Sequence, residues 1–176
     1  MTITFARTED LNAATRAAII QLCIAAHREE DFKNLFSYIP SGGRHFLAYQ
    51  EAELVSHAVV TTRWLQAEGL PILKTAYVDA VGTLPTYQGQ GYGSAVMQHL
   101  ANNIADYAIA CLETELPAFY ERLGWELWRG ALAGRNGQEI IPTPEQTGIM
   151  ILCLERTPPL HLDAQLTIEC AGERIW

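Results

Sequence analysis

The amino-acid sequence predicts a mixed α/β fold in which a central, mostly antiparallel mixed sheet is flanked by helices on both faces. Three observations support this: apolar, β-branched runs recur along the chain, amphipathic segments separate them, and a glycine-rich loop joins a long strand-like run to a helix-like run. Early strands that follow one another directly favour antiparallel pairing, whereas a strand-loop-helix-strand unit favours a parallel crossover. We therefore expect both kinds of pairing in one sheet.

The spacing of apolar residues places each element in order. Strands are predicted at residues 2–6, 44–50, 54–66, 72–84, 108–114, 149–155 and 162–170. Helices are predicted at residues 12–26, 27–40 and 115–125, and as about four turns bearing Val96, Met97, Leu100, Ile104 and Tyr107 on one face. Residues 133–148 are rich in turn formers and are expected to form a surface excursion. We expect residues 1–176 to form a single domain.

Local signals mark where several elements begin and end. Asn12 or Thr8 can cap the first long helix. Pro117 lies in the first turn of the last helix, where a missing amide does no harm, and Gly124 follows its end. The turn at residues 50–53 has poor hairpin chemistry, so it fixes the register of its two strands only weakly.

Composition narrows the class of protein. Hydrophobic residues make up 49% of the chain and charged residues 18%, as in an ordinary globular protein. The net charge is −8, and the twelve basic residues, of which Lys33 and Lys74 are the only lysines, form no basic stripe for a nucleic acid. No apolar run reaches the roughly 18 residues of a membrane span, and the first residues lack a signal-peptide pattern. We expect a cytoplasmic protein without membrane or nucleic-acid partners.

Cysteine and histidine spacing gives no metal site. The four cysteines are scattered without a CxxC pair, which is typical of reduced, mostly buried thiols. The five histidines form no HExxH or other paired spacing and are expected to be structural. Ser94 is not in a Gly-x-Ser-x-Gly elbow, so a serine hydrolase is disfavoured.

A glycine-rich loop, TYQGQGYGSA, follows the strand predicted at 72–84 and contains Gly89, Gly91 and Gly93. Glycines between a strand and a helix let backbone amides converge on an anion at the positive end of the helix. A tight turn without a ligand is the simplest alternative, but it needs fewer glycines. A P-loop is disfavoured because no Gly-Lys-Ser/Thr follows.

A dinucleotide-binding loop is a second interpretation of these glycines. Gly89 and Gly91 open that pattern correctly, and Glu113 lies about 20 residues downstream, where a ribose-binding acid is expected. Ser94, however, stands where the third glycine belongs, and too few strand-helix units follow. This interpretation is therefore the weaker one.

The third interpretation is a resemblance. LPTYQGQGYGSAVMQHL resembles the acetyl-CoA loop of the GCN5-related N-acetyltransferase (GNAT) superfamily, whose pattern Gln/Arg-x-x-Gly-x-Gly/Ala is met by Gln88, Gly91 and Gly93. FYERLGW, at 119–125, resembles its Tyr-x-x-x-Gly-Phe signature, and the predicted element order is that of the superfamily. The resemblance implies a GNAT fold and acetyl-CoA as acyl donor, with loop amides on the diphosphate and an extended strand on the pantetheine arm. The implied coenzyme-binding residues are Val81, Gly82, Thr83, Gln88, Gly89, Gln90, Gly91, Tyr92, Gly93 and Ser94.

A closer resemblance covers most of the chain. YVDAVGT, FYERLGW, PTPEQTG, EDFKNLFSYIPSGGRHFLAY and the closing LDAQLTIECAGERIW resemble segments of aminoglycoside 2'-N-acetyltransferases, which acetylate antibiotic amines. This resemblance implies a cationic small-molecule amine as acceptor, and direct attack without an acyl-enzyme. It allows a homodimer, while the sequence leaves the oligomeric state open.

The same resemblance assigns roles to individual residues. Asp79 stands where that family has a glutamate that accepts the amine proton, directly or through water, and Tyr120 stands where a hydroxyl protonates the departing sulfur. Carboxylates would bind ammonium groups of the acceptor. The implied acceptor-binding residues are Asp31, Asp79, Glu113, Glu145, Glu173 and the main-chain carboxylate of Trp176.

Two departures from that family bear on the acceptor. Phe36 replaces an early acid, and Arg174 replaces the acid two places before the final tryptophan. Losing a carboxylate and gaining a cation should weaken or redirect polycation binding. The alternatives to an aminoglycoside are a polyamine, another amine, or a non-catalytic domain that senses acyl-CoA.

Overall fold

The computed structural model describes residues 1–176, which form two compact units. The first unit consists of Met1–Thr61 and Val78–Asn103, and the second of Thr62–Tyr77 and Ile104–Trp176. Two long strands, β3 (Glu53–Ala67) and β4 (Leu73–Thr83), contribute residues to both units.

In the first unit, strands that follow one another in the sequence pair antiparallel. β1 (Thr2–Arg7) pairs with β2 (Arg44–Gln50), and β2 pairs with β3 with an irregularity between Ala48 and Tyr49. Glu51 closes the β2–β3 hairpin with a φ of 54°, a left-handed conformation that glutamate adopts at some cost. The predicted hairpin is confirmed despite this turn, because the apolar faces of both strands fix their register.

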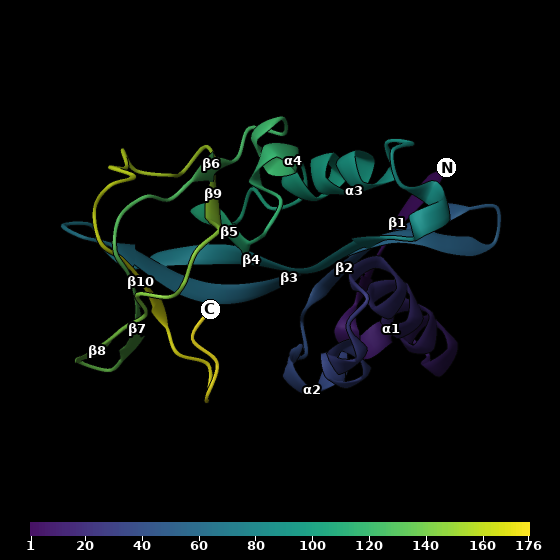
Figure 1. The fold of residues 1–176 in the computed structure, drawn as a ribbon, viewed down its shortest axis with the longest axis horizontal. Helices are drawn as coiled ribbons and strands as arrows, with labels where there is room; N and C mark the ends of the chain where they lie inside the picture. The colour runs from purple at the N-terminus through teal and green to yellow at the C-terminus, as the bar shows by residue number, and fades with distance from the viewer. The chain divides into compact units, whose positions relative to one another are not determined.

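Helices cover both faces of the strands in the first unit, with α1 and α2 on one side and α3 on the other (Figure 1). Asn12 caps α1 (Ala13–His27) by accepting the Thr15 amide proton at 2.8 Å. The remaining helical segments are η1 (Thr8–Asp10), η2 (Glu30–Asn34), α2 (Leu35–Tyr38), η3 (Pro85–Tyr87) and α3 (Tyr92–Ala101). The core between α1 and the sheet is Leu11, Ile19, Leu22, Cys23, Leu35, Ile39, Leu47, Leu54 and Val59.

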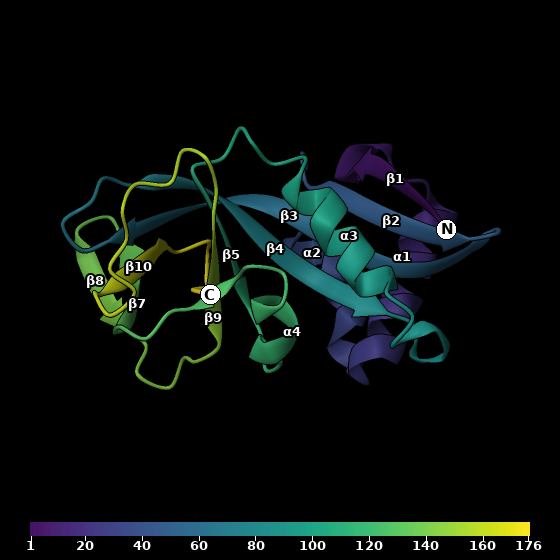
Figure 2. The ribbon, with the colours of Figure 1, turned by 90° about the horizontal axis from the view of Figure 1, so that it is seen from above.

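The second unit is mostly sheet. Its strands are β5 (Ile109–Glu113), β6 (Glu126–Leu127), β7 (Leu132–Asn136), β8 (Glu139–Pro142), β9 (Ile149–Cys153) and β10 (Leu166–Glu169), with the short helix α4 (Pro117–Glu121). With β3 and β4 their order is β6-β9-β5-β4-β3-β10-β7-β8. β10 is parallel to β7 and antiparallel to β3, so the predicted mixed sheet is confirmed (Figure 2).

Several predicted elements differ from the structure. The helix predicted at 27–40 divides into η2 and α2, and the strand predicted at 162–170 is confined to Leu166–Glu169. The helix after the glycine loop ends at Ala101 and not near Tyr107, because Asn102 and Asn103 follow and the Asn103 side chain binds the His99 carbonyl at 2.8 Å. Residues 133–148 are not a surface excursion throughout: β7 and β8 form a hairpin around Gly137, whose φ is 61°. None of the helices is both long and apolar enough to cross a membrane.

Candidate active site

The glycine loop of the first unit turns from η3 into α3 through two left-handed residues. Gly89 has a φ of 74° and Gly91 a φ of 88°, values that side-chain-bearing residues rarely adopt. A Cβ placed on either glycine would meet no atom within 4 Å. Backbone conformation and not crowding therefore requires glycine here, and the space beside the loop is open to a ligand.

Backbone amides of this loop are available to an anion. Ala95 is the first residue of α3 whose amide binds a carbonyl, that of Gly91 at 2.9 Å. The amides from Gly89 to Ser94 donate to no group of the protein. They lie at the start of a ten-residue helix, whose dipole adds positive potential. This arrangement fits a diphosphate, as helix N-termini with glycine loops do elsewhere.

The tip of the β2–β3 hairpin holds the loop in place. The Tyr87 hydroxyl donates to the Glu53 carboxylate at 2.7 Å, and the Tyr92 hydroxyl donates to Gln50 Oε1 at 3.0 Å. The two tyrosine rings meet edge to face, with centroids 5.5 Å apart. The hydrogen bond to Glu53 raises the pKa of Tyr87, so its hydroxyl keeps the proton that it donates.

Two glutamines of the loop bind its own backbone. Gln88 Nε2 donates to the Thr83 carbonyl at 3.1 Å, and Gln90 Nε2 donates to the Thr86 carbonyl at 2.9 Å. Their side chains thus brace the loop, which leaves the glycine-loop amides as the groups that face a ligand.

The C-terminal part of β4 packs against α1 and contains Asp79. Gly82 lies so close to α1 that a Cβ would come within 2.9 Å of Leu22 Cδ2 and 3.2 Å of Ala26 Cβ. Asp79 is half-buried, and Ala80 beside it has a φ of 49° in the interior of the strand. Asp79, Val81, Gly82 and Thr83 belong to the first unit, as does the glycine loop.

Asp31, the remaining predicted residue of the first unit, lies exposed in η2. Its neighbours Glu30 and Lys33 form an ion pair on the surface. Asp31 is thus accessible to solvent and to a cation. Because it is exposed, solvent and salt screen its attraction for that cation.

Tyr120, the predicted proton donor to the departing sulfur, lies in α4 of the second unit. Its side chain is 7% exposed and contacts the rings of Phe119 and Trp125 edge to face. Burial raises the pKa of Tyr120 to about 12. The hydroxyl is therefore protonated throughout the physiological range, as a proton donor must be.

The predicted acceptor carboxylates of the second unit differ in their surroundings. Glu113 Oε1 accepts a hydrogen bond from Gln146 Nε2 at 2.7 Å, whereas Glu145 and Glu173 are exposed. Trp176 is buried, and its indole N–H donates to Thr143 Oγ1 at 3.0 Å.

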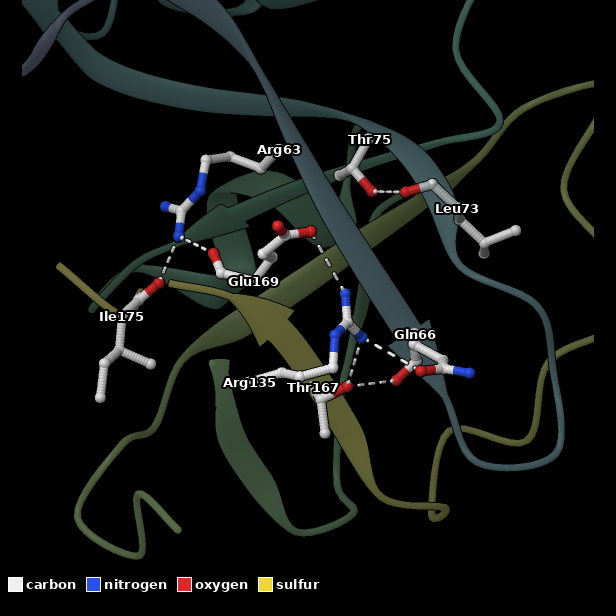
Figure 3. Close-up of polar contacts among 8 residues, drawn as sticks. All are labelled: Arg63, Gln66, Leu73, Thr75, Arg135, Thr167, Glu169 and Ile175. Carbon is white, nitrogen blue, oxygen red and sulfur yellow. Dashed lines mark hydrogen bonds and ion pairs between the residues drawn. The ribbon is translucent and has the colours of Figure 1, made fainter. Parts of the chain in front are cut away.

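Two arginines of the second unit, Arg63 and Arg135, are buried, and no structural role was predicted for them from the sequence (Figure 3). Arg63 Nη2 donates to the carbonyls of Glu169 at 2.8 Å and Ile175 at 2.6 Å, which fixes the C-terminal segment. Arg135 binds Gln66 and Thr167 and lies 3.6 Å from a Glu169 carboxylate oxygen. Arg63 lies in the run predicted as a strand at 54–66, and this was the available signal, because a charged residue inside such a run needs buried partners. Arg135 lies in the segment predicted as a surface excursion, where the sequence carried no such signal.

With this geometry established, a comparison with known protein families decides the classification. The family described as "Acetyltransferase (GNAT) domain" matches residues 4–128 of the chain. The chain belongs to this family. It is therefore an acetyl-CoA-dependent acyltransferase of the GNAT type, as the loop and element order predicted.

Individual GNAT relatives extend this result. The chain is 28% identical over 167 residues to an aminoglycoside 2'-N-acetyltransferase from Mycolicibacterium fortuitum, covering 93% of the chain and 85% of that protein. The ribosomal-protein-S18-alanine N-acetyltransferase from Escherichia coli is similar in structure, with a TM-score of 0.60, 22% identity and 99% of each chain covered. Eis1 from Mycobacterium abscessus has a TM-score of 0.63 and 22% identity over 76% of the chain, which spans only 33% of that longer protein. The two structures support the GNAT fold.

Proposed function

We propose that this GNAT protein transfers the acetyl group of acetyl-CoA to a primary amine of a cationic small molecule, most specifically the 2'-amino group of an aminoglycoside. The similarity to the Mycolicibacterium fortuitum enzyme over 93% of the chain supports this acceptor class. The net charge of −8 favours a cationic acceptor over an anionic one.

The observation that carries the proposal is the set of amides from Gly89 to Ser94 that bind no group of the protein. Several such amides at one helix start suit the diphosphate of CoA better than a single carboxylate. The open space beside Gly89 and Gly91 lets the diphosphate approach the backbone closely. Val81, Gly82 and Thr83 would then pair with the pantetheine arm as an added strand.

Asp79 and Tyr120 would handle the two protons of the reaction. An ammonium cannot attack a thioester, so Asp79 first takes one proton from the acceptor nitrogen, directly or through water, and the neutral amine then bonds to the thioester carbon. The bond from this carbon to sulfur breaks as the Tyr120 hydroxyl gives its proton to the sulfur, and a second proton from the nitrogen returns to the Tyr120 oxygen, which leaves the amide and free CoA. A backbone amide at Val81 would polarise the thioester carbonyl, and such a donor contributes about 3–4 kcal/mol in other enzymes.

The residues proposed to bind the acceptor are carboxylates. Asp31 and Asp79 belong to the first unit, and Glu113, Glu145, Glu173 and Trp176 to the second. Phe36, which departs from the aminoglycoside enzymes, lies under the Arg16 guanidinium, with Cζ 4.6 Å from the ring centroid. An aromatic ring beneath a cation, where the aminoglycoside enzymes have an acid, supports a narrower or shifted range of polycationic acceptors.

A thiol-release assay with acetyl-CoA and a panel of aminoglycosides, polyamines and simple amines tests the proposal. We expect release with aminoglycosides and acetylation of the 2'-amine by mass spectrometry and NMR. Turnover with polyamines but not with aminoglycosides would show that the acceptor is a polyamine and not an aminoglycoside. CoA binding by calorimetry without any thiol release would favour the acyl-CoA sensor.

A further inference from the structure

A strained residue lies between two positions of the proposed chemistry. Ala80, between Asp79 and Val81, has a φ of 49°, whereas the other side-chain-bearing residues with positive φ, Arg28 and Glu51, lie at a helix end and a hairpin turn. A left-handed alanine inside a strand is strained and persists only where its surroundings enforce it. The groups that bind Ala80 therefore control the direction of the peptides on either side.

A buried histidine binds the carbonyl of this residue. His57, on β3, is fully buried, and its Nδ1 lies 2.9 Å from the Ala80 carbonyl oxygen. Cys23 Sγ, on α1, approaches the same oxygen at 3.9 Å. A carbonyl oxygen accepts only, so His57 Nδ1 must carry the proton.

That proton assignment determines the state of a chain of buried groups. With Nδ1 of a neutral His57 protonated, its Nε2 is an acceptor, and His45 Nδ1 at 3.0 Å must donate to it. His45 Nε2 is then an acceptor for the Thr8 hydroxyl at 3.1 Å. Burial lowers the pKa of His45 to about 3 and of His57 to about 4, so both rings are neutral as the chain requires. One direction of donation, from Thr8 to Ala80, satisfies every group.

A second side chain of β3 binds the next carbonyl on the same edge. Ser56 Oγ donates to the Gly82 carbonyl at 2.9 Å and lies 2.8 Å from Thr83 Oγ1. The carbonyls of Ala80 and Gly82 thus both face β3. Alternate residues of an extended strand direct their peptide groups to opposite edges, so those of Val81 are directed away from β3. This is the direction needed for an added ligand strand.

We propose that His57, held in one tautomer by His45, is a positioning residue that fixes the left-handed conformation of Ala80 and so aims the Asp79 carboxylate and the Val81 amide at the reacting groups. This inference rests on the proposed acetyl transfer. It assigns no proton transfer to His57, which acts only by holding the Ala80 carbonyl.

Two isosteric substitutions separate the two hydrogen bonds of His57. In His57→Asn the amide nitrogen takes the place of Nδ1 and can still donate to Ala80, whereas in His57→Gln the amide takes the place of Nε2 and reaches only His45. Each variant loses one buried hydrogen bond, so both should be destabilised to a similar degree. A role limited to stability would therefore affect the activity of the two variants equally.

The activity measurement compares kcat, KM and CoA affinity in both variants at a temperature where both are folded. We expect His57→Gln to lower kcat by about 10- to 100-fold, the size of effect caused by misplaced reacting groups. His57→Asn should retain kcat within about threefold, and calorimetric CoA affinity should change much less than kcat in both variants, because the glycine-loop amides proposed to bind the diphosphate are untouched. Equal kcat values in the two variants would overturn the inference.

Histidine tautomers give a readout that needs no activity. Long-range ¹H–¹⁵N spectra of the wild-type protein at pH 7 should show His57 and His45 as Nδ1–H tautomers, and an Nε2–H tautomer at His57 would refute the positioning role. If the wild type binds CoA but releases no thiol with any amine, the proposed function fails. The spectra then still decide whether His57 donates to the Ala80 carbonyl.

Discussion

Arg174 binds the main-chain oxygen of Trp176 through its Nε atom, at 2.7 Å. The same guanidinium lies over the Tyr77 ring, with Cζ 5.3 Å from the centroid. A main-chain oxygen that is already bound to a cation attracts an ammonium group less strongly. The expected role of Trp176 in acceptor binding is therefore opposed by a residue two positions before it.

Removing this cation should improve the binding of polycationic acceptors. We expect Arg174→Gln to lower KM for aminoglycosides about three- to tenfold, the range of one partly exposed charge interaction, with little change in kcat. Steady-state kinetics at two salt concentrations would measure this, and the effect should shrink at high salt. Arg129→Gln, which removes an exposed cation paired with Asp163, is the matched control. An unchanged KM would place Arg174 outside acceptor recognition.

Coenzyme binding should depend on the left-handed conformation at Gly91. Gly91→Ala meets no steric obstacle but forces alanine to a φ of 88°, so we expect the Kd for CoA to rise about tenfold. Calorimetry with CoA measures this directly. Gly137→Ala imposes a similar strain in the β7–β8 turn and should leave the Kd unchanged. Equal affinity of wild type and Gly91→Ala for CoA would contradict the proposed amide site.

Asp79 should affect turnover and not coenzyme binding. We expect Asp79→Asn to lower kcat by about 10²–10⁴-fold, because the acceptor ammonium then loses its proton acceptor. The Kd for CoA should stay unchanged, and part of the activity should return at high pH, where more amine is neutral. Asp163→Asn removes an exposed carboxylate and serves as the control. Full activity of Asp79→Asn at pH 7 would exclude this role.

Tyr120→Phe should lower kcat without changing the Kd for CoA. Because burial raises the pKa of Tyr120 to about 12, the wild-type hydroxyl stays protonated up to pH 10, and its ionisation should cause no loss of rate below that pH. A pH–rate profile from pH 6 to 10 on wild type and variant checks both statements. A basic limb near pH 9 that disappears in Tyr120→Phe would show that the hydroxyl ionises much earlier.

Acid should destabilise the first unit through its two buried histidines. Burial, with the nearby charges of His57 and Arg16, lowers the pKa of His45 from 6.5 to about 3, and burial lowers that of His57 from 6.5 to about 4. The unfolded chain therefore binds more protons below pH 6.5, so the free energy of unfolding falls as pH drops from there toward 4. Each pKa unit corresponds to about 1.4 kcal/mol, which makes the total loss several kcal/mol.

Urea unfolding at pH 7.5, 6 and 5 measures this loss. A variant with His45→Gln should show a shallower decline, whereas substitution of the exposed His161 should leave the slope unchanged. A free energy of unfolding that stays constant from pH 7.5 to 5 would show that the two rings do not titrate differently in the folded and unfolded chains.

The parts of this protein that the sequence predicts are those with local signals. Gly89 and Gly91 indicate a turn in which glycine adopts a left-handed conformation, and Asn12 and Gly124 mark helix ends. Each of these residue types determines the backbone conformation of its immediate neighbourhood. The β7–β8 hairpin was not predicted because β7 pairs with the distant strand β10, where Leu166 lies opposite Leu132, and short strands are decided by such distant partners.

The candidate site divides in the same way. The loop and the positions of Asp79 and Tyr120 follow from motifs, whereas the φ of Ala80 does not, since alanine carries no signal for a left-handed conformation. His45 and His57 were predicted to be structural from their spacing alone. Only the folded arrangement of β2, β3 and β4 shows which nitrogen meets which partner.

The two tyrosine contacts between the hairpin tip and the glycine loop bear on the kinetics of coenzyme capture. Since Tyr87 and Tyr92 already immobilise the loop through Glu53 and Gln50, little chain entropy remains to be lost when a nucleotide arrives. Stopped-flow association should then be a single exponential whose rate rises linearly with CoA concentration. Freeing the loop with Tyr87→Phe and Tyr92→Phe together should introduce a slower, saturating phase, the sign of a loop that must first find its shape.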